Sequence, residues 1–138
     1  MENEIFTESE IGTVAARIVA SLKPGDILAL SGPLAAGKTT LTQAMMSHMG
    51  YLGRVTSPTF VIERRYKVNW HDIKEVIHLD FYRLDKKELA KLDWEEYTNH
   101  RTGLVIIEWP ERAESLLPKT AHLVRIEKVD EKTRKIQY

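Results

Sequence analysis

The residues whose spacing most clearly suggests chemistry form one short run, Gly32-Pro33-Leu34-Ala35-Ala36-Gly37-Lys38-Thr39, which satisfies the pattern G-x-x-x-x-G-K-[ST]. A loop of this kind curls so that successive backbone N–H groups converge on an anion, and the following helix adds the partial positive charge of its N-terminus. The ammonium group of Lys38 then reaches the β- and γ-phosphates of a nucleotide, while the Thr39 hydroxyl ligates Mg²⁺. Thr40 is placed to donate a hydrogen bond to the α-phosphate. The run therefore predicts a site for Mg-ATP.

The sequence on both sides of this run supplies the elements that position it. Ile27-Leu28-Ala29-Leu30 is a short, continuously apolar run, as expected of a strand that is buried on both faces of a sheet. Residues from Thr39 to about Met49 follow a helical pattern, which Gly50 ends. The alternative interpretation is a plain strand–turn–helix corner with a solvent-exposed lysine. Motif and context together favour nucleotide binding over it.

Two further strand candidates end in carboxylates. Val76-Ile77-His78-Leu79 leads into Asp80, and Leu104-Val105-Ile106-Ile107 leads into Glu108. Because the carboxyl ends of parallel strands meet at one edge of a sheet, we expect both acids at the crevice where the phosphates lie. We assign Glu108, which follows the more apolar run, to Mg²⁺, and Asp80 to Mg²⁺, its waters or the nucleotide. The alternative for each is a carboxylate that caps the next element.

A hydroxyl-rich segment, Thr56-Ser57-Pro58-Thr59, follows the predicted helix. Such a loop can close over a γ-phosphate and be released on hydrolysis, as switch loops do. Hydroxyl residues and proline are also ordinary turn residues, so spacing alone favours a turn. Phe60-Val61-Ile62 then predicts a strand, and its polar continuation over 63–67 indicates that this strand runs to a sheet edge.

The remaining pattern completes the fold. Apolar residues at helical spacing predict a helix over 8–22 and one or two short helices over 86–98. Residues 122–126 and 134–138 alternate between apolar and polar, which predicts a C-terminal antiparallel hairpin. We expect an α/β fold, a P-loop NTPase-like three-layer domain with a mixed, mainly parallel sheet. Residues 1–138 form a single domain in this interpretation.

The composition excludes several classes of protein. The 138 residues carry 20 basic and 20 acidic side chains, whereas nucleic-acid binders usually carry a basic excess, so any RNA contact must be local or made through a partner. The chain has no cysteine, which excludes disulfide scaffolds and fits a reducing compartment. It lacks a signal-peptide pattern and a spanning apolar stretch, so we expect a cytoplasmic protein. The five histidines show no metal-ligand spacing, and we interpret His78 as a hydrogen-bonded structural residue rather than a general base.

Beyond the glycine-containing loop, the chain carries three more blocks in a definite order. The four blocks are 32–40, Thr56-Ser57-Pro58-Thr59-Phe60, His78-Leu79-Asp80-Phe81-Tyr82-Arg83-Leu84 and Ile107-Glu108-Trp109-Pro110-Glu111-Arg112. In content, spacing and chain length they resemble the TsaE family, bacterial ATPases required for threonylcarbamoyladenosine modification of tRNA. The first block is generic, whereas the third and fourth are distinctive. The resemblance covers nearly the whole chain.

The resemblance implies roles for the residues already singled out. Lys38 and Thr39 would bind phosphate and Mg²⁺, Glu108 would ligate Mg²⁺, and Asp80 would lie at the nucleotide. It also raises Thr59 from a turn residue to a catalytic switch residue. The fold implied is a P-loop α/β domain with a mixed sheet, in agreement with the pattern of elements.

The resemblance adds three further site residues and exposes two departures. Trp109 and Tyr82 would line the site, although core packing is the alternative for each. Arg134 would flank the nucleobase, although a solvated strand face is the alternative. Relatives usually have glycine at the position of Ala35, and if that position needs φ above zero, alanine costs on the order of 1 kcal/mol. They also often place a nucleotide-contacting threonine where this chain has Glu10.

By resemblance, ATP hydrolysis would drive or reset a partner, the TsaB–TsaD transferase complex, and would be weak without it. Contact with tRNA would be made through that complex, with no role for a membrane or DNA. The basic cluster formed by Arg64, Arg65 and Lys67, with Arg54 nearby, is more simply interpreted as a solvated strand face than as a tRNA contact.

Three other functions share the loop motif. A small-molecule kinase needs an acceptor pocket, and nothing in the sequence resembles one. A GTPase needs the guanine-specifying Asn-Lys-x-Asp pattern, which the chain lacks. A nucleotide-dependent assembly factor without turnover overlaps with the preferred interpretation, and only a hydrolysis measurement separates the two.

Overall fold

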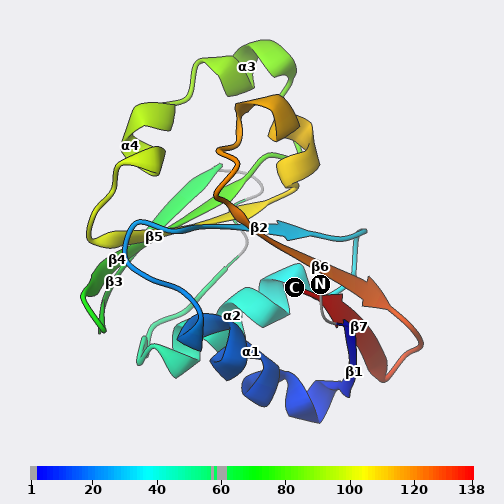
Figure 1. The fold of residues 1–138 in the computed structure, drawn as a ribbon. Coiled ribbons are helices and arrows are strands. Elements are labelled where there is room, and N and C mark those ends of the chain that lie inside the picture. Colours follow the sequence, from blue (N-terminus) through cyan, green and yellow to red (C-terminus); the bar gives the residue numbers. More distant parts are fainter. Residues whose placement is uncertain (1–2, 57, 59–61) are drawn as a thin grey trace.

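In the computed structural model, which describes residues 3–56, 58 and 62–138, the chain folds around one sheet of seven strands (Figure 1). The strands are β1 (Asn3–Thr7), β2 (Ile27–Ser31), β3 (Glu63–Trp70), β4 (Ile73–Asp80), β5 (Gly103–Glu108), β6 (His122–Lys128) and β7 (Thr133–Gln137). The helices are α1 (Ile11–Ala20), α2 (Lys38–His48), α3 (Lys86–Ala90) and α4 (Trp94–Thr98), with two 3-10 helices, η1 (Glu8–Glu10) and η2 (Pro110–Leu116). Across the sheet the strand order is β1-β7-β6-β2-β5-β4-β3.

Parallel pairing is confined to the middle of this sheet. β6 pairs with β2, β2 with β5 and β5 with β4 in parallel, whereas β1–β7, β7–β6 and β4–β3 are antiparallel. The sheet of the described residues is therefore mixed, as expected, but the expectation of a mainly parallel sheet is wrong, because the two kinds of pairing are equally frequent. The physical reason is that the hairpins β3–β4 and β6–β7 form its flanks, and short connections permit only antiparallel pairing. The predicted C-terminal hairpin is confirmed.

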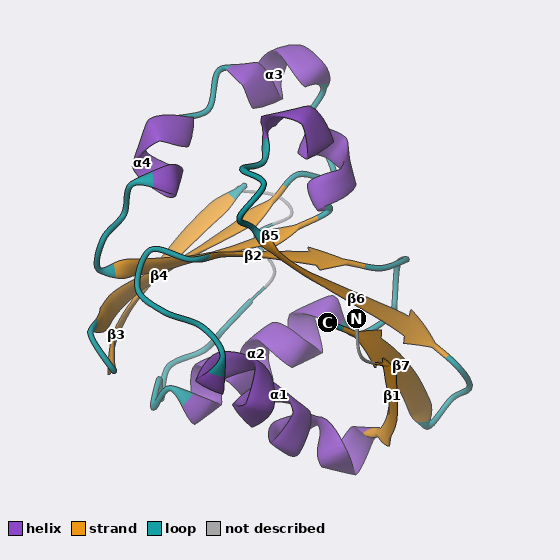
Figure 2. Ribbon diagram, viewed as in Figure 1, coloured by secondary structure: helices purple, strands orange, loops and turns teal. Residues whose placement is uncertain are grey.

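Helices cover both faces of the sheet, which confirms the three-layer arrangement. Figure 2 shows α1 and α2 on one face and α3, α4 and η2 on the other. Because side chains alternate along a strand, the central strands supply two cores: Leu28 and Leu30 of β2 pack with α1 and α2, and Ile27 packs on the opposite face. Within the described ranges, no helix is long and apolar enough to cross a membrane.

The two edges of the sheet differ from the sequence expectation. The pattern does not foresee β1, a strand that pairs with β7 and in which only Phe6 is fully buried. At the other edge, β3 begins at Glu63, directly after Ile62 with a φ of 70°. The strand expected over 60–62 is thus displaced toward its polar continuation, and residues 60 and 61 themselves lie outside the described part. The prediction that this strand reaches a sheet edge is confirmed.

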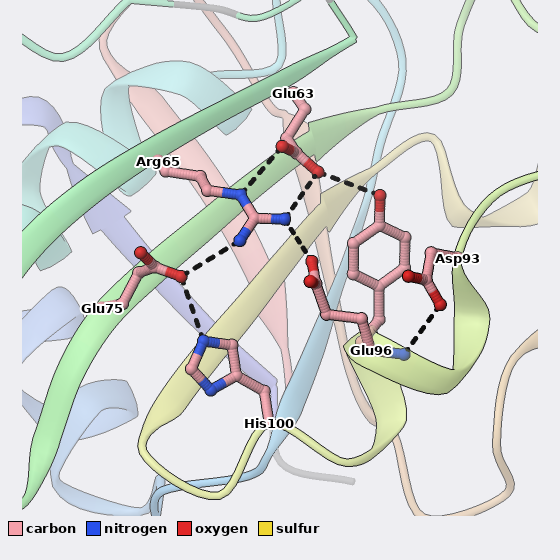
Figure 3. Close-up of polar contacts among 7 residues, drawn as sticks. Glu63, Arg65, Glu75, Asp93, Glu96 and His100 are labelled. Atoms are coloured by element: carbon pink, nitrogen blue, oxygen red, sulfur yellow. Dashed lines mark hydrogen bonds and ion pairs between the residues drawn. The ribbon is translucent and has the colours of Figure 1, made fainter.

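An ion-pair network ties α4 to the β3–β4 hairpin (Figure 3). The Arg65 guanidinium on β3 donates to Glu63 at 2.8 Å, to Glu75 on β4 at 3.4 Å, and to Glu96 on α4. The hydrogen bond from Arg65 holds the pKa of Glu63 below its usual value, although partial burial acts in the opposite direction. Arg65 is therefore engaged within the protein, which supports the interpretation of the basic cluster as part of the strand rather than as a tRNA contact.

Arg65→Gln is expected to lower the free energy of unfolding by about 1 kcal/mol at neutral pH, because three carboxylates then lose their shared cation. Urea unfolding of the wild type and the variant measures this difference. Since the folded-state pKa of Glu63 is lowered, its contribution is complete above the pKa of unfolded glutamate and is lost as the pH falls through the lower folded value. The difference between the two proteins should therefore shrink as the pH falls to about 3.

The control for this prediction is Lys67→Gln, which removes an exposed positive charge two residues further along the same strand. An equal loss of stability in both variants, or a difference that grows in acid, contradicts the account.

Candidate functional site

The loop between β2 and α2 has a glycine at each end, and each is needed for a different reason. A Cβ on Gly32 would lie 2.3 Å from the carbonyl oxygen of Ile126 on β6, so only glycine lets the chain pass this strand. Gly37 is the N-cap of α2 and has a φ of 107°, a left-handed conformation that a side chain would strain. Together the two glycines define where the loop leaves the sheet and where it enters the helix.

Ala35 lies near the tip of this loop with a φ of 61°. This is the left-handed region, so the expected strain of alanine at this position is confirmed. The conformation costs on the order of 1 kcal/mol for a residue that carries a Cβ. The loop nevertheless keeps its curl, because the two flanking glycines and the buried strand before it hold its ends.

The Lys38 side chain points into the loop rather than into solvent. Only 6% of the residue is exposed, and Nζ donates to the carbonyl oxygens of Gly32 at 2.5 Å and Pro33 at 2.9 Å. The ammonium also lies 4.2 Å from the centre of the Trp109 ring, which is a cation–π contact. The alternative of a solvent-exposed lysine at a plain corner is therefore wrong.

Two carboxylates and a histidine face α2 from neighbouring strands. Asp80 ends β4 and Glu108 ends β5, and the parallel register places them side by side. Each is only 3% exposed. Glu108 Oε2 lies 2.6 Å from His78 Nε2, and Asp80 Oδ1 accepts from the backbone N–H of Tyr82 at 2.9 Å. The two acids meet as the sequence predicted, and Asp80 also caps the turn that follows it.

The carboxylates act on the charge of Lys38. Burial lowers the pKa of Lys38, and attraction to Glu108, Glu111 and Asp80 opposes that shift. Among the described residues no group of three or more His, Cys, Asp or Glu side chains forms a metal cage. A cation held by Thr39 and Glu108 would therefore need further oxygen ligands from a bound anion and water, as Mg²⁺ usually does.

Most of the predicted site residues surround one cavity of about 300 Å³. Its lining consists of Leu34, Ala35, Ala36, Gly37, Lys38, Thr39, Thr40, Asp80, Glu108, Trp109 and Arg134. Gly32 and Pro33, also assigned to the site, line a neighbouring hollow instead and contribute their carbonyl oxygens to Lys38. Thr59 lies outside the described residues, so its predicted switch role stays a prediction.

Arg134 reaches the loop from β7, next to the edge strand β1. Its Nε donates to the Ala36 carbonyl oxygen at 3.0 Å and its Nη1 to the Asp130 carbonyl oxygen at 2.9 Å. Nη2 lies 3.8 Å from the Glu8 carboxylate, and 13% of the side chain is exposed. The alternative of a solvated strand face is therefore wrong for this residue. Arg134 instead braces the loop through the Ala36 carbonyl oxygen, and its expected contact with a nucleobase stays a prediction.

Trp109 owes its place at the cavity to an unusual backbone conformation. The residue follows β5 with φ 60° and ψ 48°, which turns the chain into η2. Its ring contacts Tyr82 in a tilted arrangement with centroids 4.8 Å apart. The guanidinium of Arg112 lies over the Tyr82 ring, 5.6 Å from its centre. Trp109 therefore lines the cavity, as expected. The expectation that Tyr82 also lines it is wrong, because the Tyr82 ring packs against Trp109 instead.

Sequence reasoning missed several residues around the loop. A second hollow, of about 320 Å³ and distinct from the one that Gly32 and Pro33 line, shares Gly37, Thr40 and Arg134 with the first cavity. Its other lining residues are Phe6, Glu8, Ile11 and Ile126. Phe6 on β1 and Glu8, which follows β1 directly, escaped notice because β1 carries no clear strand pattern. Glu10, which stands where relatives often have a nucleotide-contacting threonine, does not line this hollow. Its carboxylate accepts from the backbone N–H of Thr7 at 2.9 Å and closes a capping box.

Fold and site together define a three-layer α/β protein in which a curled glycine-containing loop and two strand-end acids enclose one cavity. The family described as threonylcarbamoyl adenosine biosynthesis protein TsaE matches residues 5–136. The chain belongs to this TsaE family, which confirms the resemblance seen in the four sequence blocks.

Individual relatives agree with this assignment. The chain is 33% identical over 129 residues to the tRNA threonylcarbamoyladenosine biosynthesis protein TsaE of Bacillus subtilis, covering 94% of this chain and 78% of that protein. It is 38% identical over 103 residues to the protein of the same name from Haemophilus influenzae, covering 74% of this chain but only 63% of that protein. The crystal structure of Bacillus subtilis YdiB superposes with a TM-score of 0.76 at 29% identity, covering 98% of this chain and 83% of that one.

Ala35→Gly is expected to raise the free energy of unfolding by about 0.5 kcal/mol. Relief of the left-handed strain exceeds the added entropy of glycine in the unfolded chain. Thermal or urea unfolding measures the change.

The matched control for this prediction is Ala36→Gly, because Ala36 is buried and is not a left-handed position. The free energy of unfolding of Ala36→Gly should be lower than that of the wild type by about 1 kcal/mol. Destabilisation of similar size in both variants would show that the strain at Ala35 is not significant.

Proposed function

We propose that this chain is a P-loop ATPase that hydrolyses Mg-ATP in the threonylcarbamoyladenosine modification of tRNA. The observation that carries the proposal is the convergence of Lys38, Thr39, Asp80 and Glu108, from three separate parts of the chain, on one cavity beside a curled loop. The relatives' names support the pathway. The cavity supports the reaction class, because it combines an anion-binding loop with acids placed for a divalent cation.

Binding of the triphosphate follows from the way Lys38 is held. In a loop of this shape the backbone N–H groups and the N-terminus of α2 attract an anion. Lys38 Nζ exchanges the carbonyl oxygens of Gly32 and Pro33 for oxygens of the β- and γ-phosphates, which are stronger acceptors because they are charged. The exchange also relieves the burial of an ammonium group that two neutral carbonyls satisfy only partly.

Thr39 and Glu108 hold Mg²⁺ in this proposal, and Asp80 contacts its waters or the nucleotide. When bound, the ion neutralises the charge that develops on the phosphates. Glu108 and Asp80 carry negative charge that would otherwise repel a triphosphate, so the acids favour the nucleotide only together with the cation. Thr59 is proposed as the switch residue that closes over the γ-phosphate.

The nucleobase is assigned to the second hollow. Phe6 and Ile126 give it apolar surfaces, and it shares Gly37, Thr40 and Arg134 with the first cavity. Arg134 lies between the two hollows and is placed to flank both the base and the loop.

The partner proposed is the TsaB–TsaD complex, whose cycle the ATPase drives or resets. The net charge of zero suits a protein that contacts tRNA through a complex rather than alone. Hydrolysis is expected to be weak without the complex, because the sequence offers no arginine at a definite position to act as a finger. A cytoplasmic location, without contact to membranes or DNA, completes the proposal.

Lys38→Ala is expected to weaken Mg-ATP binding by roughly 100-fold, because the phosphates lose their main point charge. Glu108→Ala should change affinity by less than about tenfold but lower turnover by roughly 100-fold, since it acts through the cation. Nucleotide affinity is measured by isothermal titration calorimetry, and turnover by phosphate release with TsaB–TsaD present. Lys87→Ala, an exposed lysine on α3, is the control.

Three results would count against these roles. Wild-type affinity and turnover in Lys38→Ala would remove the loop from the site. Equal losses of binding and turnover in Glu108→Ala would remove its metal role. Appearance of a phosphorylated small molecule in place of free phosphate would indicate the alternative, a small-molecule kinase.

Association with TsaB–TsaD is expected to depend on the nucleotide. Pull-down of the complex by this chain should differ among ATP, ADP and no nucleotide, because a switch loop that responds to the γ-phosphate changes the surface offered to a partner. The Lys38→Ala variant should pull down TsaB–TsaD equally with ATP, with ADP and without nucleotide. Association that is absent throughout, or identical throughout for the wild type, contradicts the proposed partner role.

A further inference from the structure

His78 is a fully buried polar residue that the proposed chemistry does not yet use. Its exposed fraction is 0%, and it lies on β4 opposite Ile106 of β5. Because side chains alternate along strands, His78 shares a sheet face with Asp80 and with Glu108, its diagonal neighbour. It is not among the residues that line the cavity. His78 can therefore act on the site only through a neighbouring side chain.

The direction of its hydrogen bond follows from the chemistry of the two partners. Nε2 of His78 lies 2.6 Å from Oε2 of Glu108, and a carboxylate oxygen accepts, so Nε2 carries the hydrogen. Nδ1 is buried and has no partner in the part of the chain that the structure describes. The opposite tautomer would set a lone pair of Nε2 against Oε2 and leave a buried N–H without an acceptor, an arrangement that is strongly penalised.

We propose that His78 is the positioning residue for Glu108. Its Nε2–H holds Oε2, and because a carboxylate is planar, this contact also sets the direction of Oε1, which is left for the cation or its water. Hydrogen bonds of this kind orient metal-ligating side chains in many proteins. The strand places the imidazole rigidly, since both neighbours in sequence, Ile77 and Leu79, are fully buried in the core on the opposite face.

This inference rests on the proposed function, because a positioning role for Glu108 has meaning only if Glu108 holds a cation. The contact itself does not depend on that function. Two measurements therefore separate the contact between His78 and Glu108 from the proposed function. One is made on the free protein without nucleotide, and the other on catalysis.

The first measurement is the ¹⁵N NMR spectrum of the histidine rings in the free wild-type chain. His78 should show a protonated Nε2 and an unprotonated Nδ1. Glu108→Ala should shift its ring signals more than those of His48, His71 and His122. Protonation at Nδ1 in place of Nε2, or ring signals unaffected by Glu108→Ala, overturns the proposal whatever the protein does with ATP.

The second measurement compares two amide substitutions. In His78→Gln the side-chain nitrogen can reach the position of Nε2, whereas in His78→Asn it is too short to reach Glu108. With TsaB–TsaD present, His78→Asn should lower turnover by roughly 10- to 100-fold and raise the Mg²⁺ concentration for half-maximal rate by a similar factor, whereas His78→Gln should stay within about threefold of wild type in both. Nucleotide affinity measured without Mg²⁺ should be similar in all three proteins.

The outcomes of this comparison are distinct. Equal losses in the two variants, or wild-type turnover in His78→Asn, overturn the positioning role while leaving the ATPase proposal standing. If the wild type itself releases no phosphate with its partners, the proposed function fails, and the role of His78 toward a cation fails with it, even if the NMR spectrum confirms the contact.

Discussion

The positive charge of Lys38 is removed from water, and much of the site follows from how that charge is satisfied. A buried ammonium needs hydrogen-bond acceptors and nearby negative charge. The loop carbonyls of Gly32 and Pro33 supply the first, and the strand-end acids Glu108 and Asp80 supply the second. The loop must curl to bring those carbonyls inward, and the strands must end level with it. In the proposed ATPase the same charge is then available to a triphosphate.

Parallel and antiparallel strand pairs stabilise this arrangement in different ways. The central parallel strands bring acids from sequence positions far apart to one edge, because parallel strands end on the same side. The antiparallel strands on both sides of them add side-chain contacts that hold the loop and α4. β7 sends Arg134 back to the loop carbonyl of Ala36, and the β3–β4 hairpin is tied to α4 through Arg65. A wholly parallel sheet would leave the loop without its brace on the β7 side.

The sequence predicted the parts of the site in which local pattern and chemistry agree. The run 27–30, the loop and its helix were predictable because burial on both faces, glycine spacing and helix periodicity each leave a direct mark. The convergence of Asp80 and Glu108 was predictable because each ends an apolar strand and the carboxyl ends of parallel strands meet at one edge of a sheet. The strain at Ala35 was foreseen as a condition, and the φ of 61° fulfils it.

Other features depend on contacts between residues distant in sequence and leave no local mark. Edge strand β1 is too short and too exposed to show alternation, so the hollow that contains Phe6 was missed. The capping box at Thr7 and Glu10 depends on where the helix begins, which is the least predictable part of a helix. The hydrogen bond between His78 and Glu108 depends on the register of β4 and β5, and no sequence pattern specifies that register.

The most direct test of the central claim is a crystal structure of this chain with Mg²⁺ and a non-hydrolysable ATP analogue. The account predicts that the triphosphate lies in the loop, that Lys38 Nζ leaves the carbonyl oxygens of Gly32 and Pro33 for phosphate oxygens, and that the ion lies between Thr39 and Glu108. A triphosphate bound elsewhere, or a Lys38 that keeps both carbonyl contacts with the nucleotide in place, would contradict it.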